Sequence, residues 1–136
     1  MKYIITSLIL LFLTACKTET TETIKTVSIK DDVTFLASDA LEGRQTGSDG
    51  EQKAAKYIAE RFKNIGVQEK GTNGYFQTFT FRPKTDPHQE VNYTVKDGDS
   101  TITGTNVIGF IDNKEENTII IGAHYDHLGL GAEGSL

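Results

Sequence analysis

The 136-residue chain has one cysteine, two prolines, no tryptophan and no cluster of basic residues. The single cysteine, Cys16, excludes both an intramolecular disulfide and a zinc site built from several cysteines. The 19 acidic and 14 basic side chains give a net charge of −5, which argues against a nucleic-acid partner. The remaining composition is that of an ordinary globular protein, and the length suits one domain.

The chain also lacks a hydrophobic run long enough to span a bilayer. The longest apolar run covers residues 3–13, whereas a transmembrane helix needs about 20 residues. This run follows Lys2, which is typical of a secretory signal. The next residues, Leu13-Thr14-Ala15-Cys16, resemble the lipobox of bacterial lipoproteins, in which the cysteine thiol is lipidated and becomes the new N-terminus.

We therefore expect residues 1–16 to be a lipoprotein signal peptide and Cys16 to be the lipid attachment site. Two or more acyl chains make membrane anchoring stable, so the mature protein is expected on an extracytoplasmic membrane surface, facing the periplasm or the cell exterior. An ordinary signal with a chance cysteine, or an uncleaved anchor, is the alternative. Residues 17–27 are polar and threonine-rich, which predicts a solvated tether before a domain at residues 28–136.

Two helices are expected at the start of this domain. Ser28 begins the first, with apolar residues at helical spacing (Ile29, Val33, Leu36 and Ala40). Ser48 and Glu51 form a capping box that begins the second, which ends at Gly66. The apolar face of the second helix contains Ala54, Ala55, Ile58, Phe62 and Ile65.

Strands are expected after the helices. Residues 75–81 are aromatic and threonine-rich, residues 91–95 and 101–103 suggest a hairpin, and residues 107–111 suggest another strand. Residues 118–123 are apolar on both faces, which predicts a central strand covered on both sides. The order favours an α/β fold with a mixed central sheet flanked by helices.

The predicted central strand runs directly into His124, Tyr125, Asp126 and His127. Sites in open α/β sheets form at the carboxyl ends of strands. A histidine at such an end can bind a metal while a carboxylate two residues later orients its ring. The alternative is a polar loop in which His124 caps the strand and Asp126 begins a turn.

Several segments, in order, resemble the two-zinc aminopeptidase family, which includes bacterial leucyl aminopeptidases and glutamate carboxypeptidase-like enzymes. These segments are residues 36–44 (LASDALEGR), 46–47 (TG), 54–58 (AAKYI), 75–77 (YFQ), 106–109 (NVIG) and 119–129 (IIIGAHYDHLG). The resemblance implies a zinc exopeptidase that hydrolyses peptide substrates at chain ends through a metal-activated water. It assigns His124 as a ligand of one of two zinc ions and Asp126 as its catalytic carboxylate partner. Tyr125 and His127 are then expected to line the pocket.

The chain departs from the family pattern because the other zinc ligands are expected after Leu136. The fold is therefore expected to be truncated after the first metal-ligand strand. A catalytic zinc needs about three protein ligands, so we predict that the 136 residues alone bind zinc weakly and are inactive. Two alternatives stay open. A metallo-β-lactamase type of hydrolase would need a histidine where this chain has Gly122. The other alternative is a non-catalytic binding lipoprotein on the same fold.

Overall fold

The computed structural model describes residues 28–84, 88 and 90–131. The predicted signal peptide, Cys16 and the tether lie outside these residues. The described chain forms, in order, α2 (Ile29–Leu36), the 3-10 helix η2 (Asp39–Arg44), α3 (Asp49–Asn64), β1 (Gln68–Glu69), β2 (Phe76–Phe81), β3 (Ile102–Val107) and β4 (Gly109–Phe110). These elements confirm a mixed α/β class. Within the described ranges, no helix is both long enough and apolar enough to cross a membrane.

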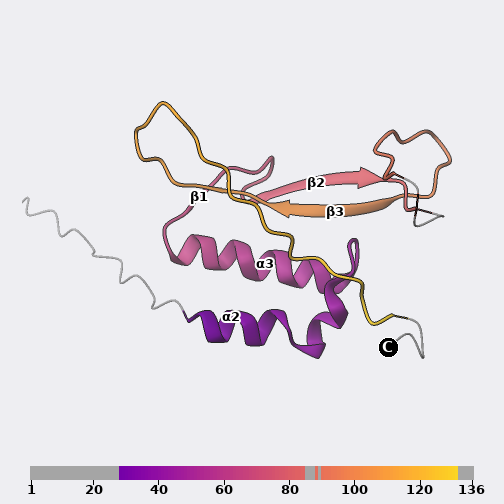
Figure 1. Ribbon diagram of the computed structural model, residues 1–136, viewed down its shortest axis with the longest axis horizontal. Coiled ribbons are helices and arrows are strands. Elements are labelled where there is room, and N and C mark those ends of the chain that lie inside the picture. The colour runs from indigo at the N-terminus through magenta and orange to yellow at the C-terminus, as the bar shows by residue number, and fades with distance from the viewer. Residues whose placement is uncertain (1–27, 85–87, 89, 132–136) are drawn as a thin grey trace, which may run out of the picture.

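Helix α3 lies between the β2–β3 ladder and α2, so the elements form three layers (Figure 1). Its expected start is confirmed, because the Ser48 side chain accepts a hydrogen bond from the Glu51 backbone N–H at 3.2 Å. Much of the apolar core is made of alanines on this helix, which allow close approach of the neighbouring elements. The buried apolar residues are Leu41, Ala54, Ala55 and Ala59.

Helix α2 forms as expected behind its Ser28 cap, but a different face packs against α3. Ile29 and Val33 are 76% and 60% exposed, so the predicted apolar stripe is not buried. Instead, the Phe35 ring stacks on the Tyr57 ring of α3 with 4.2 Å between centroids. The carboxylate of Asp32, on α2, also binds α3. Aromatic stacking and charged hydrogen bonds orient α2, which the apolar spacing alone could not predict.

The β2–β3 ladder corrects the predicted hairpin of residues 91–95 with residues 101–103. β2 confirms the strand expected over residues 75–81, but it pairs antiparallel with β3, from Phe76 opposite Val107 to Phe81 opposite Ile102. Gly104 allows this pairing, because a Cβ there would lie 2.7 Å from the Phe79 ring. The strand expected over residues 107–111 is divided between β3 and β4, and β4 pairs with β1.

The prediction of a covered central strand at residues 118–123 is wrong for the described structure. These residues belong to neither ladder, and Ile119, Ile120 and Ile121 are 88%, 90% and 93% exposed. No described strand pairs with their backbone and no described helix covers their side chains. The two described sheets are two-stranded and antiparallel rather than one mixed central sheet.

Candidate metal-binding segment

His124 lies in an extended segment with its ring held from one side. The ring Nδ1 is 3.0 Å from the Asp126 backbone oxygen and 3.5 Å from its carboxylate Oδ1. Both partners only accept hydrogen bonds, so a neutral ring donates its proton from Nδ1. Its Nε2 then carries the lone pair, and the side chain is 83% exposed. This is the tautomer in which Nε2 can bind a metal.

The Asp126 carboxylate is held from a distant part of the chain. Its Oδ2 accepts a hydrogen bond of 2.6 Å from the hydroxyl of Thr46, which is 80 positions earlier. The other oxygen, Oδ1, is the one that faces His124. The carboxylate therefore connects the His124 ring to the turn that precedes α3.

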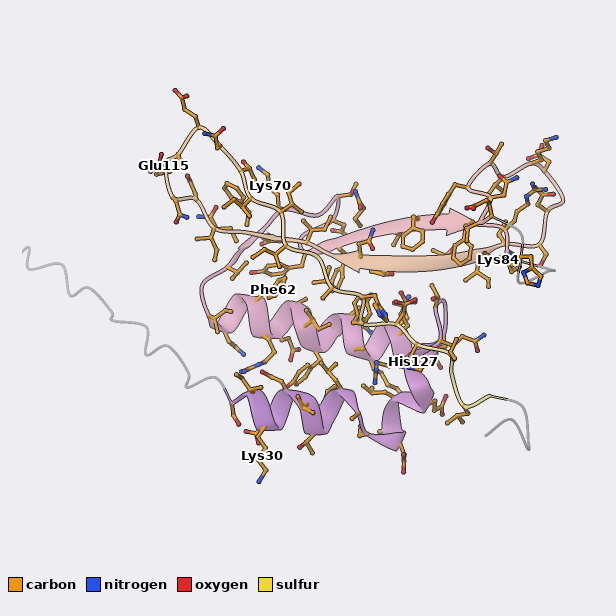
Figure 2. All side chains as sticks on the ribbon, viewed as in Figure 1. Lys30, Phe62, Lys70, Lys84, Glu115 and His127 are labelled. Carbon is orange, nitrogen blue, oxygen red and sulfur yellow. The ribbon has the colours of Figure 1, made fainter. Side chains whose placement is uncertain are left out.

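Gly43 and Arg44 hold the segment that follows His124 through hydrogen bonds. The His127 N–H donates to the Arg44 carbonyl at 2.8 Å, and the Gly129 N–H donates to the Gly43 carbonyl at 3.0 Å. Arg44 Nε in turn donates to the Tyr125 carbonyl at 2.6 Å. A Cβ on Gly43 would lie 2.3 Å from the Gly129 oxygen, so the close approach requires glycine. Figure 2 shows His127 near the turn between η2 and α3.

Tyr125 points between α3 and β3. Its hydroxyl donates to the Thr105 carbonyl and lies 3.4 Å from Glu51 Oε1. Burial raises the pKa of the Tyr125 phenol, and the nearby Glu51 charge raises it further. The phenol therefore stays neutral and anchors the segment. The exposed His127 instead accepts a hydrogen bond at Nδ1 from the Leu128 N–H at 2.8 Å.

Glu51 is a buried carboxylate at the start of α3. The capping box predicts the hydrogen bond of its backbone N–H to Ser48 but not the partners of its side chain. The side chain is 2% exposed. Its Oε2 accepts from the Gly47 N–H at 2.7 Å, one residue before the expected Ser48 partner. Its Oε1 accepts from the Thr105 N–H of β3 at 2.8 Å. Glu51 thus joins the start of α3 to β3 beside Tyr125, a role that its local sequence does not reveal.

A pocket of about 510 Å³ lies next to Thr46, between the start of α3 and the start of β3. Its lining has hydroxyls, amides and one apolar side chain but no ionisable group; it consists of Gln45, Thr46, Gly47, Ser48, Gln52, Thr101, Ile102 and Thr103. None of the expected site residues lines it. Tyr125 and His127 therefore do not line this pocket.

The described residues do not complete a zinc site. Among them, no group of three or more His, Cys, Asp or Glu side chains could hold a metal ion together. His124 fits a single ligand position with an orienting carboxylate, whereas catalytic zinc takes about three protein ligands. The arrangement can therefore supply one corner of a metal centre.

Comparison of the chain with protein-family models, curated proteins and solved structures found no match.

Proposed function

We propose that residues 28–136 belong to a zinc-dependent exopeptidase of the aminopeptidase type, which hydrolyses peptide substrates at chain ends. One observation supports this proposal above the others. Segments that resemble the family, residues 36–44 and 46–47 on one side and residues 119–129 on the other, are far apart in sequence but in direct contact. Arg44 binds the Tyr125 carbonyl and Thr46 binds Asp126. A shared site accounts for such contacts better than an unrelated polar loop does.

In this proposal His124 is a zinc ligand through Nε2 and Asp126 orients its ring. Two zinc ions would polarise the peptide carbonyl and activate a water molecule when bound. The described residues supply only one ligand, so no catalytic step is assigned to them. We accordingly expect the 136 residues alone to be inactive.

For the fold, we infer a mixed central sheet flanked by helices. This sheet would have more strands than the two described ladders. The exposure of Ile119, Ile120 and Ile121 favours it. Burying an isoleucine side chain contributes about 1.5–3 kcal/mol, and adjacent exposed apolar residues mark surfaces that become covered.

Zinc dependence tests the proposed reaction. By the full gene product we mean the protein with the further zinc ligands that the family resemblance places after Leu136. It should hydrolyse an aminoacyl chromogenic substrate, lose activity in the presence of a chelator and regain it on addition of zinc. The 136-residue chain serves as the inactive control. Activity that survives complete zinc removal would contradict the metal mechanism.

A non-catalytic binding lipoprotein on the same fold is the second candidate, because the contacts of Arg44 and Thr46 with the segment after His124 are hydrogen bonds that need no metal. It predicts saturable peptide binding by the full gene product, measured by calorimetry, with no hydrolysis at any zinc concentration. Hydrolysis would contradict this candidate.

We also propose that lipidated Cys16 anchors the protein to an extracytoplasmic membrane surface, on the basis of the lipobox resemblance. Cys16→Ser should move the protein from the membrane pellet to the soluble fraction, because the thiol that carries the lipid is gone. Unchanged membrane association would contradict this assignment.

A further inference from the structure

Thr46 is held in one orientation by contacts on both sides of its Cβ. Its hydroxyl lies 2.6 Å from Asp126 Oδ2. Its methyl group faces β3, where a Cβ added to Gly104 would lie 2.9 Å from Thr46 Cγ2. Since the methyl group fills the space that Gly104 leaves, the hydroxyl is directed towards the carboxylate.

The backbone around Thr46 is fixed to the same segment. Gln45 and His127 form a parallel β-bridge, and the Ser48 N–H donates to the Gln45 carbonyl at 2.9 Å. Thr46 therefore lies between a backbone bridge and the start of α3. A hydroxyl mounted in this way can restrain a neighbouring carboxylate.

We propose that Thr46 is a positioning residue, which holds the Asp126 carboxylate so that its other oxygen faces His124 Nδ1. The effect reaches the His124 ring without direct contact. Thr46 occupies Oδ2 and leaves Oδ1 3.5 Å from the ring Nδ1, where it adds to the Asp126 backbone oxygen at 3.0 Å in favouring the tautomer protonated at Nδ1. This inference rests on the proposed function only in treating His124 Nε2 as the metal-binding atom.

The ring tautomer of His124 in the zinc-free chain tests the proposal independently of activity. Two-bond ¹H–¹⁵N correlation spectra distinguish Nδ1–H from Nε2–H at a pH above the ordinary histidine pKa of about 6.5. Wild type should show mostly Nδ1–H. Thr46→Val keeps the side-chain shape but loses the hydroxyl, so its Nδ1–H fraction should fall. Thr46→Ser keeps the hydroxyl but loses the methyl group that directs it, so its Nδ1–H fraction should lie between those of wild type and Thr46→Val.

The matched control is Thr80→Val on β2, which removes a hydroxyl that lies 3.3 Å from the Thr103 hydroxyl. It should leave the His124 tautomer unchanged. Circular dichroism establishes that each variant is folded, and Thr46→Ala replaces Thr46→Val if the latter is unfolded. A His124 tautomer that is the same in wild type and in the folded variant without the hydroxyl would overturn the proposal.

Zinc titration of the full gene product separates this inference from the proposed function. Loss of a group that orients a metal ligand directly weakens metal binding by about 10–100-fold; because Thr46 acts one contact further away, Thr46→Val should weaken zinc binding by about tenfold, the lower end of that range. Binding that depends on His124 but not on Thr46 overturns the positioning role alone. A Thr46-dependent tautomer in a protein that binds no zinc overturns the metal assignment alone.

Discussion

Glu51 shows how a single side chain can join two elements at the residue scale. Its carboxylate binds the Gly47 N–H before α3 and the Thr105 N–H of β3. Thr105 is 5% exposed, so water cannot easily replace the carboxylate at that amide. The residue therefore satisfies a backbone donor that the β2–β3 ladder leaves unpaired.

Removing this carboxylate should destabilise the fold. Glu51→Ala leaves the buried Thr105 N–H without an acceptor, which costs about 1–3 kcal/mol. The free energy of unfolding, measured by urea denaturation, should fall by that amount. Glu60→Ala, at an exposed position of the same helix, should change it by less than about 0.5 kcal/mol. Equal effects of the two substitutions would contradict the assigned role of Glu51.

Asp32 makes the packing of α2 on α3 dependent on pH. Hydrogen bonds from Arg61, and then from Tyr57, lower the pKa of the Asp32 carboxyl. Both contacts are short, with Arg61 Nε and the Tyr57 hydroxyl each 2.6 Å from the Asp32 Oδ1 atom. A lowered pKa means that the stabilisation is present above the unfolded-state pKa of about 3.9 and is lost as pH falls through the folded-state pKa.

Comparison of wild type with Asp32→Asn across pH measures this effect. Wild type should be more resistant to urea at neutral pH, and the difference should shrink as pH falls below about 4, when the wild-type carboxyl becomes protonated. Tyr57→Phe removes one of the two contacts and should show part of the same change. A difference between wild type and Asp32→Asn that is constant from neutral pH down to pH values below 4 would exclude this linkage.

Sequence alone indicated some residues of the candidate site and missed others for a physical reason. His124 and Asp126 are two positions apart, so their spacing alone predicts a ring and its orienting carboxylate. The contact of Thr46 with Asp126 spans 80 positions, and that of Glu51 with Thr105 spans 54. Such pairings depend on how η2, α3 and β3 pack, which local pattern does not determine.

At the scale of elements, the sequence predicts a helix best where a capping residue precedes apolar residues at helical spacing. Ser48 and the alanines of α3 identify that helix from sequence. The pairing of β3 depends instead on contacts between residues that are far apart in sequence. Gly104 leaves room for the Phe79 ring of β2, and the Thr105 N–H donates to the Glu51 carboxylate of α3. The buried face of α2 also depends on distant contacts, because Asp32 and Phe35 both contact Tyr57 on α3. The apolar spacing within α2 therefore does not predict which face is exposed.

Hydrogen exchange distinguishes the paired strands from the apolar segment after them. Amides in the β2–β3 ladder should be protected, while those of residues 118–122 should exchange rapidly in the 136-residue chain, because neither ladder of the described residues includes them. Mass spectrometry of the exchanged peptides measures both. Strong protection of residues 118–122 would show that the segment is paired.

At the scale of the whole molecule, three layers bring the start of α3, the edge of β3 and the segment with His124 together. The left-handed backbone of Glu42, Gly43 and Arg44, with φ values of 49°, 67° and 50°, turns the chain so that it meets the segment with His124. The described fold therefore positions one metal-ligand candidate and its support.

The substitution His124→Ala in the zinc-loaded gene product tests the proposed metal role most directly. Bound zinc and the rate of hydrolysis of an aminoacyl chromogenic substrate are measured together, with His88→Ala as the histidine control. We predict that His124→Ala reduces bound zinc and lowers the rate of hydrolysis at least about 100-fold. Loss of a group that only orients a ligand costs up to about 100-fold, so loss of the ligand itself should cost at least as much. His88→Ala should change neither the bound zinc nor the rate. Full zinc content and full activity in His124→Ala would contradict the account.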